Sequence, residues 1–226
     1  GLEVEVLATE GHPIVLGEWR GAGANAPTVL VYGHYDVQPP EPLELWTSPP
    51  FEPTEREGRI YARGSADDKG QLYMHVKALE AHLATSGSLP VNVVVLAEGE
   101  EEVGSPNLVP FVDAHLERLA CDVVVISDTG MFAEGLPSIL FSLRGLAYFE
   151  IHVHGARSDL HSGEFGGSVM NPGNALSQII ASLHDDQGRI ALPGFYDNVV
   201  EWDAETREQI AALPHSDDET REELGV

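Results

Sequence analysis

The chain has 226 residues, of which 42% are hydrophobic, and its formal net charge at pH 7 is −25. This length and apolar content suffice for one large domain, or for one and a half smaller ones, with a real core. The acidic balance argues against nucleic acids and membranes as partners, because both bind a basic protein face. No stretch is long and apolar enough to cross a bilayer, and the single cysteine, Cys121, fits a reducing compartment, so we expect a cytoplasmic protein.

The first part of the chain alternates short apolar runs with longer amphipathic segments. Continuous short apolar runs, as at 91–97 and 122–126, are typical of buried strands, and the alternation of apolar residues with glutamates over 2–6 is typical of a half-buried strand. Apolar residues spaced three or four apart are typical of helices. These patterns predict strands at residues 2–6, 13–19, 28–32, 59–62, 91–97 and 122–126, helices over 72–83 and 108–119, and an irregular loop over 38–58. The order strand, helix, strand, helix, strand after residue 28 implies an α/β fold with a mostly parallel sheet and flanking helices.

The pattern changes near residue 138. Residues 139–143 and 147–153 alternate in polarity, which predicts an antiparallel hairpin. A glycine-rich loop then leads to a helix with Asn171 as its N-cap. We therefore expect two domains, an α/β domain over residues 1–138 and the start of a smaller α+β domain over residues 139–226.

Short polar segments follow three of the predicted strands and precede one helix. In chain order they contain His34 and Asp36, Asp67 and Asp68, Glu98 to Glu102, and Asp128. Ligands of open α/β sheets bind at the carboxyl ends of the strands. These side chains should therefore lie together on one rim of the sheet.

Each segment alone has a simpler explanation. His34 could be a hydrogen-bonded loop histidine, and the two aspartates could cap a helix. The acidic run could be a solvated loop, and Asp128 could form a turn. The coincidence of all four on one rim favours a site for divalent metal ions instead.

The residue types also suit a metal site. An imidazole with several carboxylates fits zinc, cobalt or manganese, and Asp36 can fix the tautomer of His34. If a carboxylate bridges two ions, the pair can hold a hydroxide at neutral pH and polarise a carbonyl. The adjacent Glu101 and Glu102 then offer one ligand and one general base.

Four motifs resemble, in order and spacing, the zinc-dependent aminoacylase, carnosine dipeptidase and glutamate carboxypeptidase family of metallopeptidases. They are Gly33-His34-Tyr35-Asp36-Val37, Gly64-Ser65-Ala66-Asp67-Asp68-Lys69-Gly70, Glu101-Glu102-Val103-Gly104-Ser105 and Ser127-Asp128. Gln38-Pro39 and Asp159-Leu160-His161-Ser162-Gly163 are most similar to the dipeptidase branch.

The resemblance implies a role for each site residue. His34 would bind one of two zinc ions, Asp67 would bridge both, Glu102 would complete the site of one ion and Asp128 that of the other. Asp36 would orient His34, Glu101 would be the general base, and the Asp67–Asp68 peptide bond would be cis. His161, on a dimerisation or lid domain, would reach the active site of the neighbouring subunit and stabilise the oxyanion or bind the substrate.

The activity implied is that of a homodimeric di-zinc metallopeptidase. Such an enzyme cleaves dipeptides or short peptides, as a dipeptidase or carboxypeptidase, with a hydroxide held by two zinc ions. The alternatives are an N-acyl amino acid deacylase of the same family and a non-catalytic metal-binding dimerisation fragment. Because family members are about twice as long, we also expect the chain to be incomplete and its last histidine ligand to lie outside it.

Overall fold

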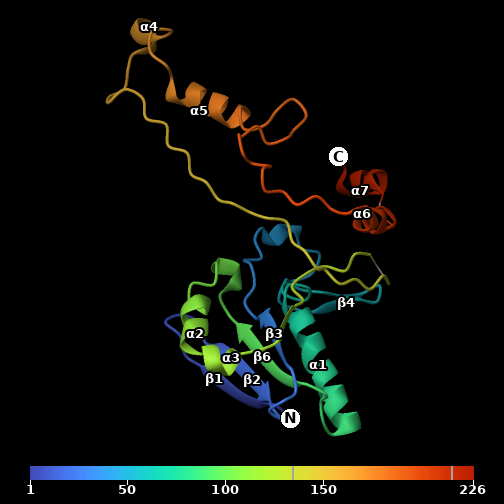
Figure 1. Cartoon of the computed structure of the whole chain (residues 1–226). Coiled ribbons are helices and arrows are strands. Elements are labelled where there is room, and N and C mark those ends of the chain that lie inside the picture. Colours follow the sequence, from blue (N-terminus) through green and yellow to red (C-terminus); the bar gives the residue numbers. More distant parts are fainter. Residues whose placement is uncertain (134, 215) are drawn as a thin grey trace. The chain divides into compact units, whose positions relative to one another are not determined.

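A computed structural model describes residues 1–133, 135–214 and 216–226 (Figure 1). The chain forms two compact units, Gly1–Leu143 and Arg144–Val226. The division follows Leu143, whereas the sequence analysis places it after Ser138; the assignment of a catalytic and a dimerisation role to the two parts stays a prediction. In the described part of the chain, no helix is long and apolar enough to span a membrane.

The first unit is built on a five-stranded sheet with the spatial order β1-β2-β6-β3-β7. The strands are β1 (Glu3–Leu7), β2 (Ile14–Trp19), β3 (Thr28–His34), β6 (Asn92–Glu98) and β7 (Val123–Ile126). The strands β6, β3 and β7 are parallel, and β2 joins β6 in the antiparallel sense. The predicted α/β class is confirmed, and the sheet is mixed because the β1–β2 hairpin extends it on one side.

The helices cover opposite faces of this sheet (Figure 1). Helix α1 (Lys69–Ser86) connects β3 to β6, whereas α2 (Leu108–Ala114) and α3 (Leu116–Leu119) connect β6 to β7. Leu72, Leu79 and Leu83 of α1 pack against Val31, Val93 and Val95. On the other face, Phe111 and Leu119 pack against Leu16, Leu30 and Val94. Since β6 and β7 lie on opposite sides of β3, right-handed crossovers produce this arrangement.

Three local predictions about the first unit are wrong. The helix expected over 108–119 is broken at His115, whose ring Nδ1 lies 2.8 Å from the carbonyl oxygen of Phe111. The loop expected over 38–58 contains a 3₁₀ turn, η1 (Leu43–Leu45), and a strand, β4 (Thr54–Arg56), which pairs with β5 (Arg59–Tyr61). Strand β7 is an edge strand, so Val123, Val124 and Ile126 are exposed rather than buried.

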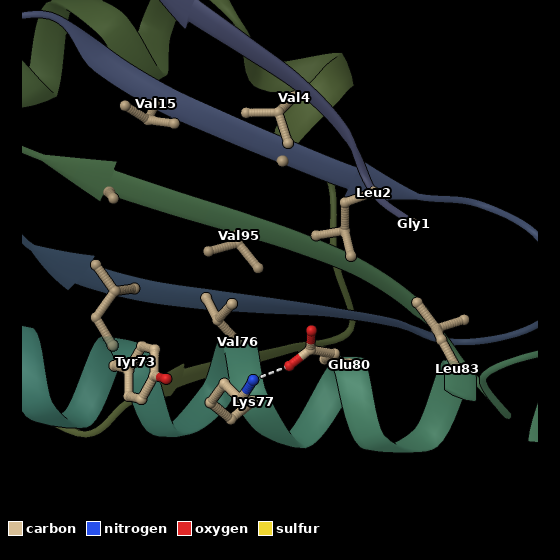
Figure 2. A pocket seen from close by; sticks show the side chains of 13 residues that line it. Gly1, Leu2, Val4, Val15, Tyr73, Val76, Lys77, Glu80, Leu83 and Val95 are labelled. Atoms are coloured by element: carbon tan, nitrogen blue, oxygen red, sulfur yellow. Dashed lines mark hydrogen bonds and ion pairs between the residues drawn. The ribbon is translucent and has the colours of Figure 1, made fainter. Parts of the chain in front are cut away.

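The sheet face that α1 covers is only partly filled. Beside α1, an apolar groove of about 630 Å³ runs along the strands. Figure 2 shows Val4, Val15 and Val95 on its sheet side and Tyr73 and Val76 on its helix side. The predicted alternation of β1 is therefore present, but its apolar face borders this groove and is not buried.

The second unit contains helices α4 (Ser162–Phe165), α5 (Pro172–Ala181), α6 (Ala204–Ala211) and α7 (Asp217–Leu224). The predicted N-cap of α5 is confirmed, because Asn171 Oδ1 accepts a hydrogen bond from the N–H of Gly173 at 2.8 Å. The hairpin predicted over 139–153 is wrong, since the residues described after β7 form no strand. Apolar side chains of that segment, such as Leu143 and Tyr148, are exposed, so burial does not stabilise a hairpin there.

Candidate metal centre

The carboxyl ends of the three parallel strands meet at one rim of the sheet. His34 is the last residue of β3, Asp128 follows β7, and Glu101 and Glu102 lie in the 3₁₀ turn η2 (Glu101–Val103) after β6. Asp67 precedes α1. We call His34, Asp36, Asp67, Glu101, Glu102 and Asp128 the rim cluster.

The imidazole of His34 lies at the centre of this cluster and is completely buried. Its Nδ1 lies 3.2 Å from Asp36 Oδ1, and its Nε2 lies 3.0 Å from Asp67 Oδ1. The same Nε2 lies 3.6 Å from Asp128 Oδ2 and 3.9 Å from Glu101 Oε2. One ring nitrogen thus faces a single orienting carboxylate, and the other faces several carboxylates.

The donor atoms of the rim cluster fit a divalent cation. His34, Asp67 and Glu102 offer three ligand atoms within 4.8 Å of one another, and so do His34, Glu101 and Asp128. Ligands of one zinc ion lie roughly 3–4 Å apart, given bonds of about 2.1 Å. The distances from His34 Nε2 to Asp67 and Asp128 fall in this range, so small side-chain movements suffice.

The electrostatics of the rim cluster also favour a cation. Burial raises the pKa of the Asp128 carboxyl, and the negative charge of Asp67 adds to this shift while His34 opposes it. Burial likewise raises the pKa of the Glu101 carboxyl, again opposed by His34. Burial lowers the pKa of His34, but the charge of Asp128 and the other carboxylates outweighs it, so the net pKa is raised. Negative charge is therefore in excess here, and a divalent cation would balance it.

Asp36 does more than orient His34. Its carboxylate also accepts hydrogen bonds from the backbone N–H groups of Glu101, at 3.2 Å, and of Glu102, at 3.0 Å. It therefore connects the end of β3 to the turn after β6. The resemblance implied only the contact with His34.

The acidic run after β6 is not a solvated loop. Glu98 is buried and accepts hydrogen bonds from the hydroxyls of Tyr32, at 2.5 Å, and Ser105, at 2.8 Å. Glu100 is also buried and accepts from the side chain of Asn107 at 2.7 Å. Two carboxylates of the run thus stabilise the turn, while Glu101 and Glu102 face the rim.

The two aspartates before α1 have different surroundings. The peptide bond between Asp67 and Asp68 is cis, as the resemblance implies. Asp68 holds the N-cap position of α1 but makes no side-chain cap hydrogen bond; instead it is buried, and its Oδ2 accepts from the backbone N–H of His34 at 3.1 Å. The helix-cap explanation therefore does not account for Asp68, and Asp67 is left facing the cluster.

His161 is the one predicted site residue that belongs to the second unit. Its ring Nδ1 accepts a hydrogen bond from the N–H of Gly163 at 3.0 Å, at the start of α4. The side chain is exposed. Its role at an active site stays a prediction.

Two contacts of the rim were not predicted. Gln38 binds the carboxylate of Glu102, and His75 Nε2 on α1 lies 2.7 Å from the hydroxyl of Ser127, next to Asp128. The spacing of two between His34, Asp36 and Gln38 could have indicated the first, because alternate side chains of an extended segment face one side. A lone histidine on a helix offers no such signal for the second.

Known proteins resemble the chain over most of its length. A profile described as Peptidase family M20/M25/M40 matches residues 30–220. The Cys-Gly metallodipeptidase dug1 of Schizosaccharomyces pombe is 41% identical over 192 residues, which cover 84% of this chain and 40% of that protein. The human Beta-Ala-His dipeptidase is 38% identical over 190 residues, which cover 83% of this chain and 37% of that protein.

A solved structure gives the same result for the fold. The M20 family metallo-carboxypeptidase Sso-CP2 from Sulfolobus solfataricus matches with a TM-score of 0.78 at 36% identity, and the match covers 100% of this chain and 51% of that one. The family resemblance inferred from the four motifs is confirmed. The chain spans less than half the length of the two dipeptidases.

Proposed function

The chain belongs to peptidase family M20/M25/M40, and from this membership we propose that it supplies the metal-binding part of a metallodipeptidase. The observation that carries the proposal is the rim cluster, in which a buried imidazole faces several carboxylates at the ends of parallel strands. The names of the relatives point to small dipeptides, Cys-Gly and β-Ala-His, as the substrate class.

We propose that His34, Asp67, Glu102 and Asp128 hold two divalent ions, with Asp67 between them, and that the ions are zinc. Imidazole and carboxylate donors suit zinc, with cobalt and manganese as substitutes. When bound, such ions lower the pKa of a coordinated water and polarise the substrate carbonyl. The protein's own contribution is to fix these donors. The Asp36 carboxylate does so by contacting Nδ1 of the His34 ring and by accepting a hydrogen bond from the backbone N–H of Glu102.

Glu101 is the proposed general base. Its Oε2 lies within the rim cluster, 3.9 Å from His34 Nε2, and the side chain is about two-fifths exposed (39%), which leaves room for a substrate. It would accept a proton from the attacking water and deliver it to the leaving amine. His161 is proposed to bind the substrate or the oxyanion in the neighbouring subunit.

We further propose a homodimer in the cytoplasm. The exposed apolar side chains of Tyr148 and Phe149 in the second unit support association, because exposed apolar surface often marks an interface. The single cysteine supports a reducing compartment. Light scattering of the natural protein that carries this chain should give twice the mass of one subunit; a monomer at micromolar concentration would contradict the dimer.

Hydrolysis of a dipeptide panel by this natural protein tests the activity. The panel contains Cys-Gly, β-Ala-His and N-acetylated amino acids, each assayed with zinc, cobalt or manganese. Glu101→Ala should lower kcat by about 10²–10⁴-fold at unchanged metal content, since a general base contributes about this much. Glu117→Ala, at an exposed glutamate of α3, is the matched control and should keep full activity.

The other outcomes separate the alternatives. Turnover of N-acetylated amino acids alone would show a deacylase. No turnover of any substrate with metal bound would show a non-catalytic metal-binding protein, and metal-independent turnover would exclude the proposed site.

A further inference from the structure

Glu101 and Glu102 are adjacent and chemically identical, yet the function proposed above needs one fixed ligand and one mobile base. Resting on that function, we propose that Gln38 is a positioning residue: it holds the Glu102 carboxylate in place for the metal and thereby separates its task from that of Glu101. The proposal depends on three contacts that cross 64 positions of sequence.

Gln38 contacts both oxygens of the Glu102 carboxylate. Its backbone N–H donates to Oε1 at 3.2 Å, and its side-chain amide donates to Oε2 at 2.7 Å. The same amide lies 3.3 Å from the carbonyl oxygen of Glu102. A carboxylate accepts hydrogen bonds through both of its oxygens, so one donor on each oxygen fixes its orientation.

The Glu101 carboxylate has no comparable support. In the described part of the chain, no hydrogen bond ends on it, and its Oε2 lies 3.9 Å from His34 Nε2. The backbone does not distinguish the two glutamates, because Asp36 accepts from the N–H of both. The difference between them therefore lies in Gln38.

The local sequence restrains Gln38 as well. Pro39 and Pro40 follow it, and a residue before proline is confined to extended backbone conformations. His34 and Asp36, which precede it at a spacing of two, are held within the rim cluster. The backbone of Gln38 therefore has little conformational freedom to lose, which lowers the entropy cost of the contact.

Zinc binding by the natural protein that carries this chain tests the proposal. Gln38→Met keeps the length of the side chain but removes its donor, and should raise the zinc dissociation constant about tenfold in a chelator competition, as loss of an outer-shell partner does. The melting temperature of the metal-free protein should not change. Gln187→Met, at an exposed glutamine of the second unit, is the control and should leave zinc affinity unchanged.

Double mutants distinguish positioning from a general structural effect. In a Glu102→Ala background, Gln38→Met should change zinc affinity less than twofold; in a Glu101→Ala background, it should still cost about tenfold. An equal loss in both backgrounds, or no loss in the wild-type background, would overturn the proposal. If the double mutants show the expected coupling but the protein hydrolyses no dipeptide, the proposed activity is overturned and the positioning role of Gln38 stands.

Discussion

The hydrogen bonds within the two units of the chain differ in how far apart in sequence their partners lie. In the first unit, side-chain hydrogen bonds connect residues far apart in sequence, such as Tyr32 with Glu98 and Arg118 with Glu5. In the second unit, the side-chain hydrogen bonds between described residues connect positions no more than six apart. Long-range contacts define a tertiary structure, whereas short-range contacts define only local elements.

Burial differs in the same way. Leu16 and Val94 of the first unit are completely buried in a core that both the sheet and α2 line. None of the second-unit residues whose burial the structure describes is buried. The comparison teaches that the first unit contains its own core, while the described residues of the second unit form none, which agrees with the dimerisation proposed for it.

Core truncation should give the largest difference between the units. Leu16→Ala should lower the free energy of unfolding of the first unit by about 3 kcal/mol, because it removes a fully buried side chain and leaves a cavity. Leu146→Ala, at an exposed leucine of the second unit, should change it by less than about 0.5 kcal/mol. Hydrogen exchange of the β6 amides measures both; similar effects of the two substitutions would mean that the units share one core.

The next effect concerns the rim cluster. Asp36→Ala should weaken zinc binding about 10- to 100-fold, because it frees the His34 ring and two N–H groups of the η2 turn at once. Asp113→Ala, at an exposed aspartate of α2, is the matched control. If both variants bind zinc as tightly as the wild type, the long-range contacts of the rim do not support the metal site.

The strands of the fold could be predicted where burial is two-sided. The short continuous apolar runs at β3 and β6, rich in β-branched residues, favour buried strands, and the cap at Asn171 follows from its own side chain. The exposure of β7 and the failed hairpin over 139–153 could not be predicted. An apolar pattern shows which side chains seek burial, but not whether another segment covers them.

The site was predictable for a similar reason, and only in part. His34 and Asp128 gather because the carboxyl ends of parallel strands meet at one rim, which their sequence positions already imply, and Asp67 joins them from the segment before α1. The separation of the acidic run into inward and outward carboxylates depends on the backbone of the η2 turn, where Gly104 has a φ of 92°. The spacing of two could have indicated that Gln38 faces the same side as His34 and Asp36, but its pairing with Glu102 depends on how two loops align.

A smaller effect tests one long-range ion pair of the first unit. Burial raises the pKa of the Glu18 carboxyl, but hydrogen bonds from Arg118 and Arg20 outweigh it, so the net pKa is lowered. A lowered pKa means that the stabilisation is present above the ordinary glutamate range and is lost as the pH falls through the native value. Glu18→Gln should therefore cost about 1 kcal/mol at pH 7 and almost nothing in acid. Urea titrations at both pH values measure this, and a cost independent of pH would exclude the ion pair as its source.

The smallest expected effect lies in the second unit and tests whether its structure is local. Asn171→Ala removes the side chain that accepts from the N–H groups of Gly173 and Asn174, and should destabilise α5 by about 1 kcal/mol or less. Asn171→Asp keeps an acceptor and should retain the helix. Because the described contacts of this unit are short-range, faster hydrogen exchange should be confined to α5 and its flanks. Faster exchange in β3 or β6 as well would show that the two units unfold together, and the distinction between a self-contained unit and a dependent one would fail.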